Sequence, residues 1–172
     1  MITLSPESTS PAENFRTAGG CVPSGADRHG NHDLMIWGVI PLATKIATKD
    51  TDGAVYLFEH KDMDKGGPPR HVHHAQDEWF YILKGEFVFE VGDERYCLGP
   101  GDSLFAPRHV PHVWACMSEE PGTMLTALSP AGTFETFITD AAAMTELPTP
   151  EEAARAFETH GMTIVGPPLP VE

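Results

Sequence analysis

The sequence predicts an all-β fold, a barrel or a sandwich of many short strands. Short apolar or alternating runs recur between residues 34 and 139, and turn signals rich in Gly, Pro and Asp separate them. Gly and Pro number 16 each among the 172 residues, which suits a chain that turns often. A single segment near the C-terminus carries helix signals. Together these three observations favour an all-β class over a mixed one.

Taken in order, residues 1–33 are rich in Ser, Pro, Gly and Asn, and predict an irregular arm. Pro41 divides the first two predicted strands, and His60 is expected at the exposed end of the third. Bulky residues alternate on both sides of the strand 78–84, so we expect it to be buried on both faces. The predicted strands lie at residues 34–40, 42–47, 54–60, 71–73, 78–84, 86–91, 94–98, 103–106, 112–117, 124–129 and 134–139.

The helix signals come late. Thr149 is the expected N-cap, Pro150 the first helical residue, and Glu152 completes a capping box. The predicted helix covers residues 151–160 and ends at Gly161, before an extended tail. The predicted organisation is therefore an N-terminal arm (1–33), a β-barrel (34–139), and a C-terminal helix and tail (140–172) packed on the barrel.

Composition limits the classes of partner. With 11 basic and 25 acidic residues the formal charge is −14, which argues against nucleic acid and anionic membranes. No apolar run approaches the ~20 residues of a membrane span, and the first residues do not resemble a signal peptide. The cysteines Cys21, Cys97 and Cys116 are far apart and odd in number, so a reduced, cytoplasmic setting is expected.

Histidines at alternate positions mark the candidate metal site. On a strand, His71 and His73 project to the same side, and Glu78 begins the next apolar run. His112 is a fourth candidate. Imidazoles and a carboxylate are typical ligands of a divalent transition metal, although His-x-His alone equally fits two solvated histidines. His74 and Asp77 are out of phase with the pair, and His109 is ambiguous.

The flanking pattern resembles the cupin superfamily over roughly residues 54–129. His71, His73, Glu78 and Gly85 follow its first motif, and Gly101, Pro107 and His112 follow its second. Three positions depart from the pattern. Gly66 is one residue too close to His71, His109 replaces an inner Gly, and Cys116 stands where Asn is usual. None of these departures removes a proposed ligand.

The resemblance implies a double-stranded β-helix, or jelly-roll barrel, holding one divalent metal (Fe, Mn, Ni, Co, Cu or Zn). The spacing to the Glu is similar to that of quercetinase-like dioxygenases of aromatic or enolic hydroxyketones. Glu78 would then be both ligand and base, with a small-molecule substrate and O2 as partners. Alternatives are a binding module without catalysis, and a cupin isomerase or decarboxylase. The candidate pocket residues are Phe80, Phe89, Phe105, Trp114 and Cys116.

The bulky second face of the strand 78–84 predicts one further feature. A single barrel does not cover such a face, so we expect a homodimer that buries it together with the N-terminal arm.

Overall fold

The computed structural model describes residues 15–30, 34–144 and 146–171. Its elements are α1 (Phe15–Ala18), β1 (Leu34–Ile36), β2 (Ile40–Ile46), the 3₁₀ helix η1 (Thr48–Thr51), β3 (Tyr56–Met63), β4 (Arg70–His73), β5 (Asp77–Lys84), β6 (Phe87–Val91), β7 (Glu94–Leu98), β8 (Ser103–Ala106), β9 (His112–Cys116), β10 (Gly122–Ser129), α2 (Phe134–Ala142), α3 (Pro150–Thr159) and β11 (Met162–Gly166).

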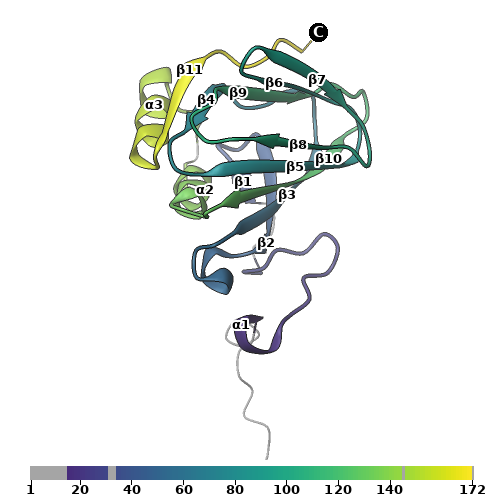
Figure 1. The fold of residues 1–172 in the computed structure, drawn as a ribbon, viewed down its shortest axis with the longest axis vertical. Coiled ribbons are helices and arrows are strands. Elements are labelled where there is room, and N and C mark those ends of the chain that lie inside the picture. The colour runs from purple at the N-terminus through teal and green to yellow at the C-terminus, as the bar shows by residue number, and fades with distance from the viewer. Residues whose placement is uncertain (1–14, 31–33, 145, 172) are drawn as a thin grey trace, which may run out of the picture.

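Two antiparallel sheets form the two layers of the barrel (Figure 1). The larger has the order β1-β2-β3-β10-β5-β8, and the smaller β11-β4-β9-β6-β7. From β4 to β10 the chain passes back and forth between the sheets, which is the winding of a double-stranded β-helix. Helices α2 and α3 lie at one end of the barrel, and the N-terminal segment extends below the larger sheet. The all-β barrel predicted from the sequence is confirmed.

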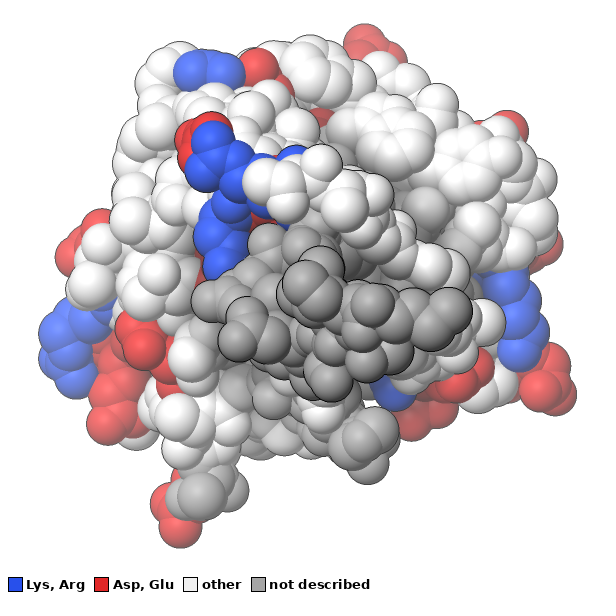
Figure 2. All heavy atoms as spheres, turned by 90° about the horizontal axis from the view of Figure 1, so that it is seen from below, with Lys and Arg blue, Asp and Glu red and all other residues white. Residues whose placement is uncertain are grey.

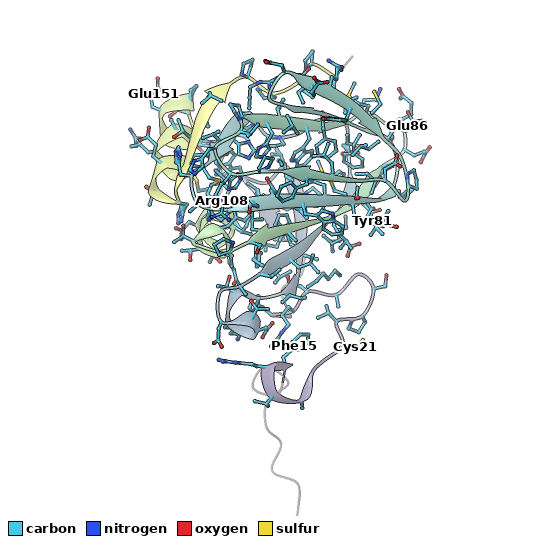
Figure 3. The ribbon with its side chains drawn as sticks, in the orientation of Figure 1. Phe15, Cys21, Tyr81, Glu86, Arg108 and Glu151 are labelled. Atoms are coloured by element: carbon cyan, nitrogen blue, oxygen red, sulfur yellow. The ribbon has the colours of Figure 1, made fainter. Side chains whose placement is uncertain are left out.

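The interior is apolar and divides into two clusters of buried residues. One lies towards the helices and includes Tyr56, Phe58 and Phe134. The other is built largely from aromatic rings of β5, β6 and β9. The sheets pack through these side chains, as Figure 3 shows, and burial of this apolar area is the main stabilising term.

The last predicted strand is wrong. Residues 134–139 begin helix α2, in which Phe134, Phe137, Ile138 and Ala141 are buried. Their spacing of three and four residues follows the helical period, and it places all four on the side facing the barrel. The predicted segment of six residues spans less than two helical turns, which is too short to distinguish this period from that of a strand. The predicted boundary at residue 139 therefore falls inside α2.

The predicted C-terminal helix agrees closely with the observed helix α3. In α3, Thr149 accepts a hydrogen bond from the backbone of Glu152, whose side chain reaches back to the backbone of Thr149. The tail beyond it contains a strand that the sequence did not predict. Residues 162–166 form β11, which pairs with β4 beside the candidate site. Pro41 also does not separate two strands, because it lies within β2 opposite Met35 on the edge strand β1.

The outer face of β5 differs from its prediction. The side of this strand that faces the barrel interior is buried, but Trp79 and Leu83 on the other side are 36% and 44% exposed. Phe105 on β8 pairs with Trp79 and is 58% exposed. Tyr81 lies on β5, two residues after Trp79 (Figure 3). In the single chain this face is therefore an uncovered apolar patch, which we call the outer patch (Trp79, Tyr81, Leu83 and Phe105).

A buried ion pair is among the contacts that join the N-terminal segment to the barrel. Arg28 makes two hydrogen bonds of 2.9 and 2.8 Å to the carboxylate of Asp50, and both side chains are almost fully buried. Of the predicted arm, residues 1–14 and 31–33 lie outside the described residues. When the molecule is seen from below relative to Figure 1, its acidic side chains lie mainly around the rim (Figure 2). None of the described helices has the length and apolarity that crossing a membrane requires.

Candidate metal centre

The two histidines of β4 lie side by side with the histidine of β9. His71 and His112 are direct partners across the β4–β9 pair, and their ring centroids are 4.5 Å apart. His73, two residues further along β4, projects to the same side, with its ring 5.1 Å from that of His71. The alternation of a strand thus produces the cluster of three imidazoles.

Glu78 reaches the same point from the opposite sheet. Three residues after β4 the chain has crossed to the larger sheet, where β5 begins at Asp77. One oxygen of Glu78 (Oε2) lies 2.9 Å from Nε2 of His112 and 3.4 Å from Nε2 of His73. Asp77 is held by two side-chain hydrogen bonds from Arg108, at 2.9 and 2.8 Å. This bidentate pair ties the start of β5 to the loop that precedes His112.

The tautomers leave the inner nitrogens without protons. Nδ1 of His71 lies 2.8 Å from the carbonyl of Pro69, and Nδ1 of His112 lies 3.2 Å from that of Val110. A carbonyl oxygen only accepts, so each Nδ1 carries the hydrogen and each neutral Nε2 presents a lone pair. Fixing the outer nitrogen on a backbone carbonyl is the usual way to orient a metal-binding histidine.

A cation fits between these lone pairs. If His112 is neutral with its hydrogen on Nδ1, the lone pair of its Nε2 faces the Glu78 carboxylate at 2.9 Å. Two such groups repel each other unless a cation, either a proton or a metal ion, lies between them. Both ring nitrogens of His73 are buried without a hydrogen-bond partner among the described residues. The four candidate ligand atoms lie within 4.8 Å of one another, and all four residues are buried. The donor set therefore fits one divalent transition metal.

The electrostatics of the cluster favour the protonation states that ligands need. Burial, together with His112 and His73, lowers the pKa of His71 to about 3, so its imidazole is neutral at pH 7. Burial by itself raises the pKa of Glu78, but the contacts of its carboxylate with the rings of His112 and His73, at 2.9 and 3.4 Å, outweigh this effect. The pKa of Glu78 is therefore well below its ordinary value, and the carboxylate is ionised.

A small cavity of about 120 Å³ adjoins the cluster. His71 and Glu78 line it, together with His60 and a largely apolar wall. The wall comes from the tip of the β1–β2 hairpin, strands β3 and β9, the loop before β4, both helices α2 and α3, and the start of β11. Its residues are Ile36, Trp37, Val39, Ile40, Phe58, Gly67, Pro68, Pro69, Trp114, Phe134, Phe137, Phe157 and Met162.

The predicted pocket residues separate into three groups. Trp114 lines the cavity. Phe80, Phe89 and Cys116 are fully buried in the core cluster of β5, β6 and β9, and they are not among the residues that line the cavity. Phe105 points to the outside, so its prediction as a pocket residue is wrong. Its neighbours on β8, Leu104 and Ala106, are the inward residues, as alternation requires.

Two of the histidines outside the cluster lie at the surface. His74 is exposed and bonds to Thr163. His109 is also exposed and has a φ of 68°, a left-handed conformation that favours Gly. This explains why the cupin motif has Gly at that position. His60 differs from its prediction, because it is 3% exposed and lines the cavity.

Fold and site together define a β-barrel with a buried histidine and glutamate cluster open to a small apolar cavity. Residues 60–128 match the sequence model of the cupin domain. That segment includes all four cluster residues. A comparison with curated proteins gives no match.

Several solved structures are similar to this chain. KdgF from Halomonas sp. is 26% identical, with a TM-score of 0.51, and the match covers 63% of this chain and 94% of KdgF. An RmlC-like cupin from Shewanella frigidimarina NCIMB 400 is 27% identical, with a TM-score of 0.45 over 55% of this chain and 78% of that one. Pac13, a nucleoside dehydratase from Streptomyces, is 14% identical, with a TM-score of 0.43 over 53% and 69% of the two chains.

Proposed function

We propose that the chain is a metal-dependent cupin enzyme that oxygenates a compact enol or hydroxyketone. The observation that carries the proposal is the position of Glu78, which belongs to the buried cluster and also lines the cavity beside it. A divalent metal held by His71, His73, Glu78 and His112 would polarise the substrate oxygen and supply the chemistry with O2.

Glu78 has the geometry of a base. Its Oε2 faces the histidines, while no described residue bonds to Oε1. An ionised carboxylate at the wall of an apolar cavity can accept a proton from a substrate hydroxyl about 3 Å away. The enol then becomes an electron-rich enolate, which is the form that O2 attacks. The wall of the cavity beside this carboxylate is largely apolar.

The cavity volume favours a smaller substrate than a flavonol. An engineered cavity of ~150 Å³ holds benzene, and this cavity is about 120 Å³. A three-ring flavonol does not fit such a space, whereas a single ring or a short hydroxyketone does. We therefore retain the dioxygenase chemistry of the quercetinase-like resemblance and propose a compact substrate for it.

O2 uptake by metal-loaded protein tests this function. The protein is loaded separately with Fe, Mn, Co, Ni or Cu and assayed with 3-hydroxypyran-4-one, 3-hydroxy-2-butanone and 3-hydroxyflavone. We expect uptake with a compact compound. Glu78→Gln should retain some metal and lose about 10²–10⁴-fold in rate. Glu86→Gln, a change at the far end of the barrel from α3 (Figure 3), should retain the full rate.

The alternatives predict different outcomes. Conversion of substrate without O2 uptake would favour an isomerase or decarboxylase, which the two proton-accepting residues of the cavity, Glu78 and His60, also support. Binding without conversion would favour a binding module. Full activity of a metal-loaded Glu78→Gln variant would contradict the role of Glu78 as base.

A further inference from the structure

His60 is a fourth histidine beside the cluster, and the proposed ligand set does not use it. It lies in β3, which continues three residues beyond it to Met63. The ring is packed edge-on against Phe58, with centroids 5.1 Å apart, and it also lies 5.1 Å from the ring of Trp114. Two aromatic neighbours and burial in the sheet hold the imidazole in one orientation.

The hydrogen bonding of His60 determines which nitrogen is free. Its Nδ1 lies 3.1 Å from the carbonyl oxygen of Pro41, so Nδ1 carries the hydrogen and donates. Burial lowers the pKa of His60 to about 4, which leaves the ring neutral near pH 7. Nε2 therefore carries a lone pair, and no described residue donates a hydrogen bond to it.

The cavity around His60 is poor in other acceptors. Apart from the cluster residues His71 and Glu78, His60 is the only side chain among the lining residues that can accept a strong hydrogen bond. The indoles of Trp37 and Trp114 can only donate. Nε1 of Trp37 is buried without a partner among the described residues. A ligand with one hydroxyl group would match this set of groups.

We propose that Nε2 of His60 accepts a hydrogen bond from a hydroxyl group of the substrate, and that the substrate is a hydroxyl compound no larger than about one six-membered ring. The inference rests on the proposed function to the extent that it places the substrate in the cavity beside the cluster. His60 is then a residue that selects and orients the substrate, while the cluster provides the metal site.

Phenol and toluene are matched probes of this role. They have the same number of non-hydrogen atoms, about the ring size that the cavity admits, and differ by a hydroxyl in place of a methyl group. Dissociation constants are measured by calorimetry on the full chain, both metal-free and loaded with Zn²⁺, which does not oxidise phenol. The quantity of interest is the ratio of the toluene constant to the phenol constant, because it cancels changes in general affinity.

We expect this ratio to be about two- to tenfold higher for wild type than for His60→Phe, the effect of one neutral hydrogen bond. His60→Gln keeps an acceptor and should recover part of the ratio. His74→Phe removes an exposed imidazole outside the cavity and should change nothing. An equal ratio in wild type and His60→Phe would overturn the proposal, as would failure of both probes to bind wild type.

Two further measurements keep the proposal testable. If His60→Phe does not fold, the ¹⁵N resonance of His60 Nε2 in wild type gives the answer, because phenol should shift it and toluene should not. A resonance that phenol leaves unchanged would overturn the hydrogen bond. 2-Naphthol should bind more weakly than phenol, and tighter binding would overturn the size limit.

The metal-free measurement separates this inference from the proposed function. If the protein takes up no metal but still prefers phenol to toluene through His60, the proposed metal-dependent oxygenase would be refuted. The proposed role of His60 would remain. Selectivity that appears only with Zn²⁺, and that His60→Phe does not change, would reflect coordination of phenol and would overturn the role of His60.

Discussion

Removing one candidate ligand should abolish stabilisation by metal. A ligand that binds only the folded chain stabilises it by RT ln(1 + [L]/Kd), about 2.7 kcal/mol at a hundred times Kd. For a domain of this size, 1 kcal/mol corresponds to roughly 2–4 °C in Tm. The cluster brings four buried ligand atoms within 4.8 Å. We therefore expect a rise of about 5–11 °C in Tm at that metal concentration.

His73→Ala removes a ligand whose two ring nitrogens have no hydrogen-bond partner among the described residues. If Kd rises about a hundredfold, the same metal concentration gives only RT ln 2, about 0.4 kcal/mol or 1–2 °C. His74→Ala is the matched control, because this histidine is adjacent in sequence but exposed and bonded to Thr163. It should retain the full rise.

The assay is thermal unfolding with and without metal, followed by chelation to reverse the effect. Comparing the shift within each variant removes any change that the substitution makes to the metal-free protein. A full rise in Tm for His73→Ala, or an equal loss in His74→Ala, would refute the ligand assignment.

Three more predictions follow from burial and geometry. A Cβ at Gly67 would lie 1.9 Å from the carbonyl oxygen of Trp114, so Gly67→Ala should cost about 1–3 kcal/mol in urea unfolding; Gly99→Ala, with nothing within 4 Å, should cost much less. The folded pKa of His60 is about 4, below its unfolded value of 6.5. The unfolded chain therefore binds the proton first as pH falls, and stability is lost from pH 6.5 down to 4. Between pH 7.5 and 5 this group should cost about 2 kcal/mol, and His60→Gln should remove that part of the pH dependence in metal-free protein. Finally, we propose that the outer patch forms a homodimer: light scattering should give twice 18.7 kDa, and Phe105→Lys with Trp79→Glu should give a monomer. A wild-type monomer at micromolar concentration would contradict this.

The sequence predicts best what depends on local spacing. The alternation of His71 and His73 requires only a strand, and the prolines before it favour one. The capping box of α3 involves residues three positions apart. Gly92 and Asp93, a pair typical of two-residue hairpin turns, join β6 to β7.

Features that depend on distant contacts were harder to predict. The side chains on the exposed side of β5 are as bulky as those on its buried side, so composition does not distinguish the two sides. The strand β11 pairs with β4 about 90 residues earlier, and its short apolar run after a helix resembles a tail. His60 lies in a run of charged residues, so the strand seemed to end there, whereas β3 continues beside β10 to Met63.

The metal cluster and most of the cavity wall come from different parts of the sequence, so the metal site and the substrate are predicted from different residues. All four cluster residues lie within residues 60–128, the segment that matches the cupin domain. Much of the wall lies outside it, including Trp37 on the β1–β2 hairpin, Phe134 on α2 and Phe157 on α3. A resemblance in the domain therefore indicates how a metal is held but not what fits beside it. His60 is the first residue of the match and contacts Phe58 just before it. We therefore expect the elements that flank the matched segment to determine which substrate is selected.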